Sequence, residues 1–192
     1  MDFQSVALER AQLEKKAIKL TRIIYKDESV KLREHTLKLK EGDLTHAVID
    51  HKDAVGIVPV EENGNVILVR QWRRAIERIT IEIPAGTIES GETPETAAKR
   101  ELTEEIHFFP EKLSYLYGFY PAPGFCTEYL HLFVAENLRI EKKERDKDEA
   151  IDVLSVSLKE ALFMIENQII IDAKTIIGLT SLRKVRPCES SI

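Results

Sequence analysis

Residues 86–108 read GTIESGETPETAAKRELTEEIHF, and this stretch decides the central part of the fold. A loop with two glycines leads into Thr93 and Pro94, which suit the N-cap and the first position of a helix. Successive helical residues step by about 100°, which gathers three apolar residues into one stripe. The stripe consists of Ala98, Leu102 and Ile106. The sequence therefore predicts an amphipathic helix that begins at Pro94.

Three glutamates flank the apolar stripe of this helix. Glu101 and Glu105 lie four residues apart beside it, and Glu104 follows on the same side. Carboxylates this close repel one another unless a cation lies between them, and a hard divalent ion with oxygen ligands is the natural solution. Mg²⁺ fits best where a phosphate supplies the remaining ligands. The competing interpretation is a solvated helix with an Arg100–Glu104 pair, because charged residues are mostly exposed.

The spacing of the whole stretch resembles the signature of the Nudix hydrolase family. Five residues separate Gly86 from Glu92, and seven more separate Glu92 from Arg100, where the acid-rich segment begins. The seven matching positions are Gly86, Glu92, Arg100, Glu101, Leu102, Glu104 and Glu105. His107 departs from the pattern, because the family has a glycine there that closes the helix in a left-handed conformation. Histidine tolerates that conformation less well than glycine.

Composition limits the classes of protein that the chain can belong to. Its 192 residues fit one domain with a small appendage, and 28 basic against 33 acidic residues give a net charge of −5. This balance argues against a general nucleic-acid binder. Cys126 and Cys188 form no metal-binding pattern, which favours free thiols in a reducing cytoplasm. We expect no membrane association, because no apolar run is long enough to span a bilayer.

The order of the expected elements defines an α/β fold. Residues 1–16 are compatible with a short helix, and strands are expected at 18–25, 29–39, 44–50, 54–60, 66–70, 79–83, 113–119, 128–135 and 151–156. Ser157 and Asp172 are expected to cap two further helices. We expect a mixed sheet between helices, preceded by a small antiparallel N-terminal β-sheet. The Nudix resemblance implies the same α/β/α sandwich. We divide the chain into 1–50, for dimerisation, and 51–192, the Nudix hydrolase domain.

Segments outside the box resemble the ADP-ribose pyrophosphatase or nucleoside-diphosphate-sugar hydrolase branch of the family. They are residues 69–73 (VRQWR), 82–86 (EIPAG) and 121–128 (PAPGFCTE), and Pro123 stands at the position of the proline that marks the branch. The resemblance implies a small-molecule nucleotide sugar as substrate and Mg²⁺ as cofactor, with Mn²⁺ as the alternative. It also implies a homodimer whose N-terminal strands exchange.

The resemblance implies roles for individual residues. The implied metal ligands are Glu101, Glu105, the backbone carbonyl of Ala85, and Glu104 as a secondary or water-mediated ligand. Arg100 is expected to orient these acids. Glu149, in an acidic loop, is the candidate general base or additional ligand. The expected substrate-binding residues are Arg73, for phosphate, and Glu128 and Glu82.

Each of these assignments has a plainer alternative. The nine charged residues from 141 to 149 form a loop that charge alone would keep in water, with no role for Glu149. Arg73 could be a solvated arginine at a strand end, and Glu128 an acid at a strand start. Trp72 is expected to pack rather than to stack on a base.

Two further functions compete with ADP-ribose hydrolysis. One is hydrolysis of another nucleoside diphosphate derivative. The other is a non-catalytic Nudix domain that binds a nucleotide metabolite. The complete set of Arg100 and the three glutamates argues against a non-catalytic domain, because such a domain has no need of metal ligands.

Overall fold

The computed structural model describes residues 6–28, 30–141 and 151–185 of the chain. The chain forms two compact units. The first unit comprises residues 1–52 and 122–128, and the second comprises residues 53–121 and 129–192. The expected functional division into 1–50 and 51–192 stays a prediction. Within the described ranges, no helix combines the length and the apolar character that a membrane span requires.

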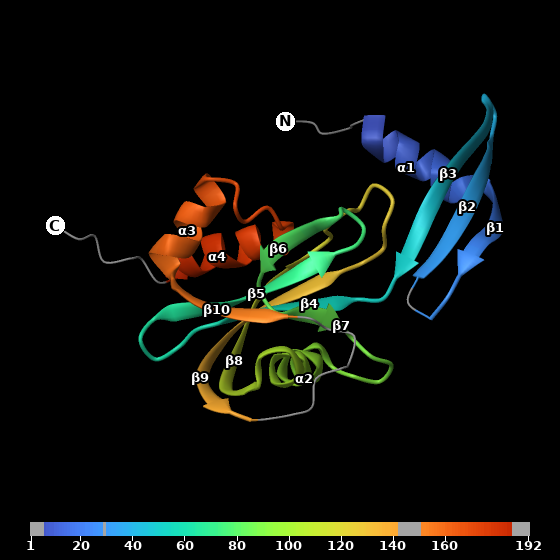
Figure 1. The fold of residues 1–192 in the computed structure, drawn as a ribbon. Coiled ribbons are helices and arrows are strands. Elements are labelled where there is room, and N and C mark those ends of the chain that lie inside the picture. Colours follow the sequence, from blue (N-terminus) through green and yellow to red (C-terminus); the bar gives the residue numbers. More distant parts are fainter. Residues whose placement is uncertain (1–5, 29, 142–150, 186–192) are drawn as a thin grey trace. The chain divides into compact units, whose positions relative to one another are not determined.

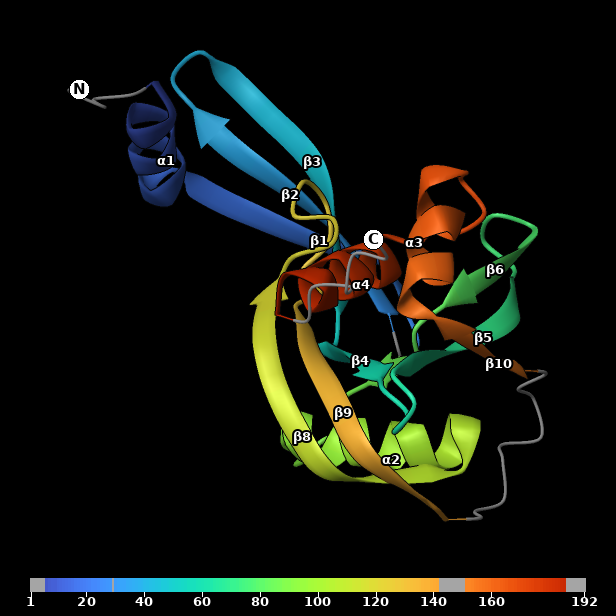
Figure 2. The same cartoon turned by 90° about the vertical axis from the view of Figure 1, so that its left-hand side faces the viewer.

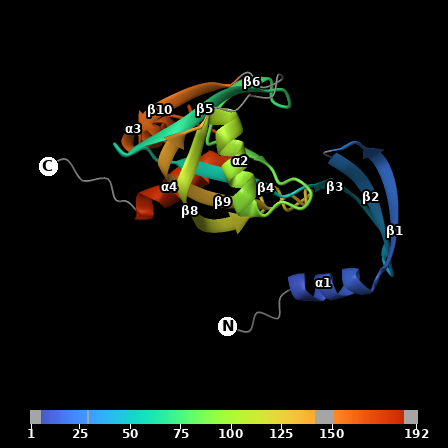
Figure 3. The same ribbon diagram turned by 90° about the horizontal axis from the view of Figure 1, so that it is seen from below.

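The first unit is a three-stranded antiparallel sheet with one helix (Figure 3). Its elements are α1 (Val6–Lys16), β1 (Ile18–Lys26), β2 (Val30–Leu39) and β3 (Gly42–His51). The sheet order is β1-β2-β3, and β2 and β3 pair without interruption from Val30–His51 to Leu39–Gly42. Residues 122–128 join this unit, because Ile49 of β3 pairs with Cys126 in a parallel bridge.

The strand β1 is exposed along its whole length. Its large apolar side chains are 47–69% exposed, and they are Ile18, Leu20, Ile23, Ile24 and Tyr25. The helix α1 likewise has no buried residue. An apolar strand of this kind is a surface that proteins usually cover.

The second unit contains two sheets and three helices. Its strands are β4 (Ala54–Pro59), β5 (Asn65–Arg73), β6 (Arg78–Glu82), β7 (Ala85–Thr87), β8 (Phe108–Phe119), β9 (Leu130–Ile140) and β10 (Asp152–Ser157). Its helices are α2 (Pro94–Ile106), α3 (Leu158–Glu166) and α4 (Ala173–Val185). One sheet has the order β7-β4-β9-β8, and β4 and β9 within it are parallel. The other has the order β10-β5-β6 and is antiparallel.

Two hydrophobic cores lie on opposite sides of the second unit's strands (Figures 1 and 2). Neighbouring residues of β4 alternate between them: Val58 packs with α3 and α4, whereas Ile57 packs with α2. Such alternation is what a strand covered on both faces must show. Gly178 lets α4 approach the sheet closely, because an added Cβ would lie 2.9 Å from a methyl group of Val58.

The expected α/β sandwich with an antiparallel N-terminal sheet is confirmed. Three differences from the expected elements are the largest. The strand β8 begins at Phe108, five residues before the expected start at Leu113, β9 continues to Ile140, and the short strand β7 was not expected. β7 is only three residues long and pairs with the beginning of β4, so no periodicity in the sequence could indicate it.

Candidate active site

The helix α2 begins and ends as local chemistry dictates. The hydroxyl of Thr93 accepts a hydrogen bond from the Thr96 amide at 3.2 Å, and Pro94 occupies the first helical turn. His107 ends the helix in the left-handed conformation with φ 61°, and its amide bonds to the Leu102 carbonyl. A histidine thus adopts the glycine-like helix end. Its Nδ1 is buried and finds no hydrogen-bond partner among the described residues.

The apolar stripe of α2 is buried, and two of its glutamates are buried beside it. Ala98 and Leu102 are fully covered, while Glu101 and Glu105 are only 9% and 4% exposed. Burying ionised carboxylates is costly unless charges or donors compensate them. The solvated-helix interpretation is therefore wrong for these two residues.

Arg100 compensates three acids at once. Its guanidinium donates to both oxygens of Glu92 at 2.8 and 3.0 Å, to Glu101 at 2.8 Å and to Glu104 at 3.0 Å. It also donates to the Thr87 carbonyl at 3.0 Å, which ties the loop to the helix. The bonds from Arg100 hold the pKa of Glu92 below its usual value, and the pKa of Arg100 is raised in return. Arg100 thus bonds to three acids, and its predicted role in orienting the metal ligands stays a prediction.

Residues 85 and 86 lie against the two buried glutamates. The Ala85 amide donates to the Glu105 carboxylate at 3.2 Å. Gly86 has no side chain where the carboxylate of Glu101 lies, and an added Cβ would be 2.0 Å from its Cδ and Oε1. The glycine of the box is thus required by the close approach of Glu101.

The donor set of α2 fits a hard divalent cation in its chemistry. Glu101, Glu104 and Glu105 offer carboxylate oxygens, which Mg²⁺ and Mn²⁺ prefer over nitrogen or sulfur. In the part of the chain that the structure describes, no group of three or more His, Cys, Asp or Glu side chains is gathered to hold a metal. Arg100 bonds to one oxygen of Glu101 and to one oxygen of Glu104, and so ties these two carboxylates to the same cation.

Arg73 and Glu82 form a second charged cluster at the β5–β6 hairpin. Arg73 donates two bonds to the carboxylate of Glu82, at 2.8 and 2.6 Å. Burial alone would raise the pKa of Glu82, but the bonds and charges of Arg73 and Lys174 and the bond from Thr80 lower it to about 2. The nearby carboxylate of Glu105 contributes to the raised pKa of Arg73. The side chain of Arg73 remains 42% exposed.

Sequence reasoning did not find the other partners of Glu82. Lys174, from the first turn of α4, forms an ion pair with it, and the Thr80 hydroxyl donates to it at 2.6 Å. Lys174 is 92 residues away in the sequence, so no local pattern could indicate the pair. Glu82 is 2% exposed, and its predicted role as a direct substrate ligand stays a prediction.

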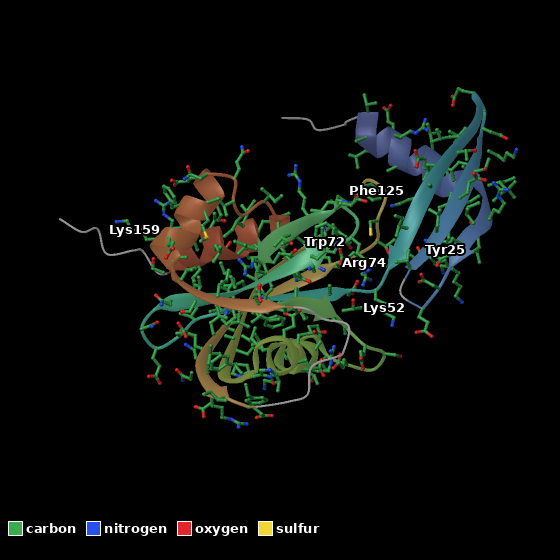
Figure 4. All side chains as sticks on the ribbon, viewed as in Figure 1. Tyr25, Lys52, Trp72, Arg74, Phe125 and Lys159 are labelled. Atoms are coloured by element: carbon green, nitrogen blue, oxygen red, sulfur yellow. The ribbon has the colours of Figure 1, made fainter. Side chains whose placement is uncertain are left out.

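Trp72 was expected to pack, but its side chain is largely exposed. It is 56% exposed at the end of β5 (Figure 4) and pairs across the hairpin with Ile79, which is itself 64% exposed. The two side chains are therefore exposed together on one face of the hairpin.

Glu128 and Glu149 both lie outside the described part of the second unit, which contains α2. Glu128 belongs to the first unit, where a carboxylate oxygen lies 3.5 Å from Nδ1 of His51. Thr127 bonds to the backbone of the same histidine, at 3.1 Å to its amide. Glu149 lies outside the described residues.

Comparison with known proteins identifies the family. The NUDIX domain matches residues 50–176. ADP-ribose pyrophosphatase of Bacillus subtilis (strain 168) is 41% identical over 138 residues, which cover 71% of this chain and 75% of that protein. The methanol dehydrogenase activator of Bacillus methanolicus is 36% identical over 175 residues, 88% of this chain and 93% of that protein. The chain belongs to the Nudix family.

A solved structure supports the fold independently. The crystal structure of an ADP compounds hydrolase superimposes with a TM-score of 0.76 and covers 88% of this chain and 94% of that one. The two sequences are 23% identical, so this likeness concerns the fold alone.

Proposed function

We propose that this Nudix pyrophosphatase hydrolyses the diphosphate linkage of ADP-ribose or a closely related nucleoside diphosphate sugar in a Mg²⁺-dependent reaction. The products are a nucleoside monophosphate and a sugar phosphate. Nudix hydrolases generally use divalent metal ions and act on nucleoside diphosphate derivatives. The choice of ADP-ribose is supported by the similarity to the Bacillus subtilis pyrophosphatase.

The observation that carries this proposal is the pair of buried carboxylates on α2. Glu101 and Glu105 lie against the Ala85–Gly86 backbone, and the nearby Arg73 offers a partly exposed guanidinium. Acids at this depth are costly in a purely structural role, whereas a metal-dependent site needs them. The planar fork of arginine suits the oxygens of a diphosphate.

The chemistry needs a nucleophile and charge compensation. A water oxygen forms a bond to one phosphorus, the bond from that phosphorus to the bridging oxygen breaks, and the leaving phosphate takes the electron pair. Glu101, Glu105, the Ala85 carbonyl and, secondarily, Glu104 would hold a divalent metal, which would supply positive charge and lower the pKa of a water molecule. Arg100 keeps these carboxylates oriented, and Arg73 binds the diphosphate. Glu149 stays the predicted acceptor of the proton.

We further propose that the enzyme is a cytoplasmic homodimer and that the dimer forms through the first unit. The apolar strand β1 is exposed on both faces, and a second copy of the chain would cover it. The free thiol of Cys126 is in keeping with a reducing compartment. Glu128 is proposed to contact the sugar hydroxyls of the substrate.

A substrate panel with and without metal tests the reaction. ADP-ribose and other nucleotide sugars are incubated with Mg²⁺, with Mn²⁺ or with a chelator, and release of phosphate monoesters is measured. We expect turnover with metal only, and ADP-ribose to be hydrolysed best. Tight binding of one compound without turnover of any would instead favour a metabolite-binding domain, and preference for another compound would replace ADP-ribose in the proposal.

Two substitutions on α2 make the test specific to the site. Glu105→Gln is expected to lower kcat by at least about 10²-fold with little change in melting temperature, because it removes one metal-binding charge. Glu95→Gln, on the exposed first turn of the same helix, is the matched control and should behave as wild type. Unchanged turnover in Glu105→Gln would remove this residue from the ligand set.

A further inference from the structure

The first turn of α4 contacts the glutamate that holds Arg73. Lys174 forms an ion pair with Glu82, and its Nζ lies 3.1 Å from a carboxylate oxygen of Asp172. The Lys174 side chain is only 12% exposed, so this cation is directed inward rather than into solvent. Lysine is seldom buried unless it is paired, and this one pairs with two acids.

The bonds around Glu82 fix both of its oxygens. Oε1 accepts from Nε of Arg73 at 2.8 Å and from the Thr80 hydroxyl at 2.6 Å. Oε2 accepts from Nη2 of Arg73 at 2.6 Å and from Nζ of Lys174. A carboxylate has about four lone-pair positions, so Glu82 is fully occupied. Thr80 and Lys174 thus fix the plane of the Glu82 carboxylate. The two bonds from Arg73 to this carboxylate in turn fix the plane of the Arg73 guanidinium.

Lys174 is itself held by a rigid support. The neighbouring Thr175 is fully buried, donates to Asp172 at 2.6 Å and accepts from the Ile83 amide at 2.8 Å. Two consecutive residues at the end of β6, Glu82 and Ile83, are therefore bonded to consecutive residues of α4. The close packing at Gly178 fixes the same helix against β4 one turn later.

We propose that Lys174 is a positioning residue, which acts through Glu82 to aim the guanidinium of Arg73 at the substrate diphosphate. This inference rests on the proposed function, in which Arg73 binds the diphosphate. Lys174 contacts no reacting atom in this role. Lys174 supplies the second positive charge beside Glu82, so the carboxylate is paired with two cations. The pairing with Lys174 keeps the carboxylate in place when the partly exposed Arg73 side chain moves.

Loss of Lys174 would leave Oε2 of Glu82 bonded to Arg73 alone, with only the Thr80 hydroxyl still holding the carboxylate through Oε1. The Glu82–Arg73 pair could then rotate as a unit, because Arg73 is partly exposed and can move outward. A misplacement of about 1 Å at a positioned group can cost up to about 10²-fold in rate. Because Arg73 binds the substrate before and during the reaction, the loss should appear in KM, with kcat nearly unchanged.

The test compares neighbouring positions of α4. Lys174→Met removes the charge and the donor and keeps the length of the side chain. Lys174→Gln keeps a donor without the charge, and it carries the test if the methionine variant does not fold. Thr175→Val is the matched control, because it loosens the support of Lys174 but keeps the charge and the donor that pair with Glu82. We expect KM for ADP-ribose to rise about tenfold in Lys174→Met and less in Lys174→Gln. Thr175→Val should lower the melting temperature and raise KM clearly less than Lys174→Met does.

A wild-type KM in both Lys174 variants would overturn the inference, and so would an equal rise of KM in Thr175→Val. Arg73→Met is measured in parallel, and a KM unchanged by it would also overturn the inference. If wild type turns over no nucleotide sugar, the proposed function fails, and binding of ADP-ribose measured by calorimetry then decides the inference. Weaker binding in both Lys174→Met and Arg73→Met would support it, whereas wild-type binding in Lys174→Met, or no binding by wild type, would overturn it.

Discussion

Substitution of Gly86 by alanine should separate activity from folding. The added methyl group would lie 2.0 Å from Cδ and Oε1 of Glu101, whereas ordinary contacts begin at 3.4 Å. The backbone of Gly86 does not have a positive φ, so alanine causes no strain of its own there. The clash is with the end of a flexible side chain, which can swing away. The Glu101 carboxylate must therefore move by about 3.4 − 2.0 = 1.4 Å.

The expected effects differ greatly in size. A displacement beyond 1 Å at a metal-binding group should lower kcat/KM by about 10²-fold, or about 2.7 kcal/mol of transition-state stabilisation. The cost in folding is smaller. The Arg100–Glu101 bond, a charge-assisted bond at a partly buried position worth about 1.5 kcal/mol, is lost, and an alanine that restricts the unfolded chain offsets about 0.5 kcal/mol of this.

A double-mutant cycle with Glu101→Ala tests whether the effect runs through Glu101. Steady-state hydrolysis of ADP-ribose is measured for wild type, Gly86→Ala, Glu101→Ala and the double variant, and thermal unfolding of each is followed by circular dichroism. We expect the double variant to be no slower than Glu101→Ala alone. Wild-type activity in Gly86→Ala would refute the reasoning, as would a further 10²-fold loss in the double variant.

Two other predictions concern acid stability and assembly. The folded pKa of Glu82, about 2, lies below its ordinary value of 4.5, so its stabilising effect is complete above pH 4.5 and is lost as the pH falls to 2. The loss in the free energy of unfolding is on the order of 3 kcal/mol. Urea unfolding at several pH values should show a smaller loss in Lys174→Met, where one cation is missing. Parallel curves of stability against pH for the two proteins would contradict this prediction. Light scattering of the wild-type protein should give twice the chain mass of 22.0 kDa. The variant Ile23→Lys, on the exposed strand β1, should give the mass of the monomer. A monomer mass for wild type would rule out the dimer.

The parts of the site that local sequence encodes were predictable. The Thr93 cap, the first-turn Pro94 and the apolar stripe are all within one helix, and each depends on residues at most four apart. The same spacing brought Glu101 and Glu105 to one side. The bonds of Arg100 to the acids also followed from the box, because its partners are neighbours on the helix or in the preceding loop.

The rest depends on contacts between distant segments. Lys174 and Glu82 meet only because α4 packs on β4 and β9, and nothing in the residues around either one indicates the other. The start of β8 at Phe108 was missed because the strand begins immediately after the left-handed His107, with no turn residues between helix and strand. The exposure of Trp72 depends on which face of the β5–β6 hairpin other elements cover, and the strand's own sequence does not indicate this.

The segment from Ala122 to Glu128 belongs to the first unit although it is encoded within the second. The polypeptide therefore passes between the units at three places, after Lys52, after Pro121 and after Glu128. A truncation at Lys52 would remove β3, and with it the backbone of Ile49, to which this loop is hydrogen-bonded. The Ile49 amide donates to the Phe125 carbonyl at 2.7 Å, and the Thr127 amide donates to the Ile49 carbonyl at 3.0 Å. The first unit therefore cannot be transplanted as a single continuous segment, because residues 1–52 and 122–128 would have to be moved together.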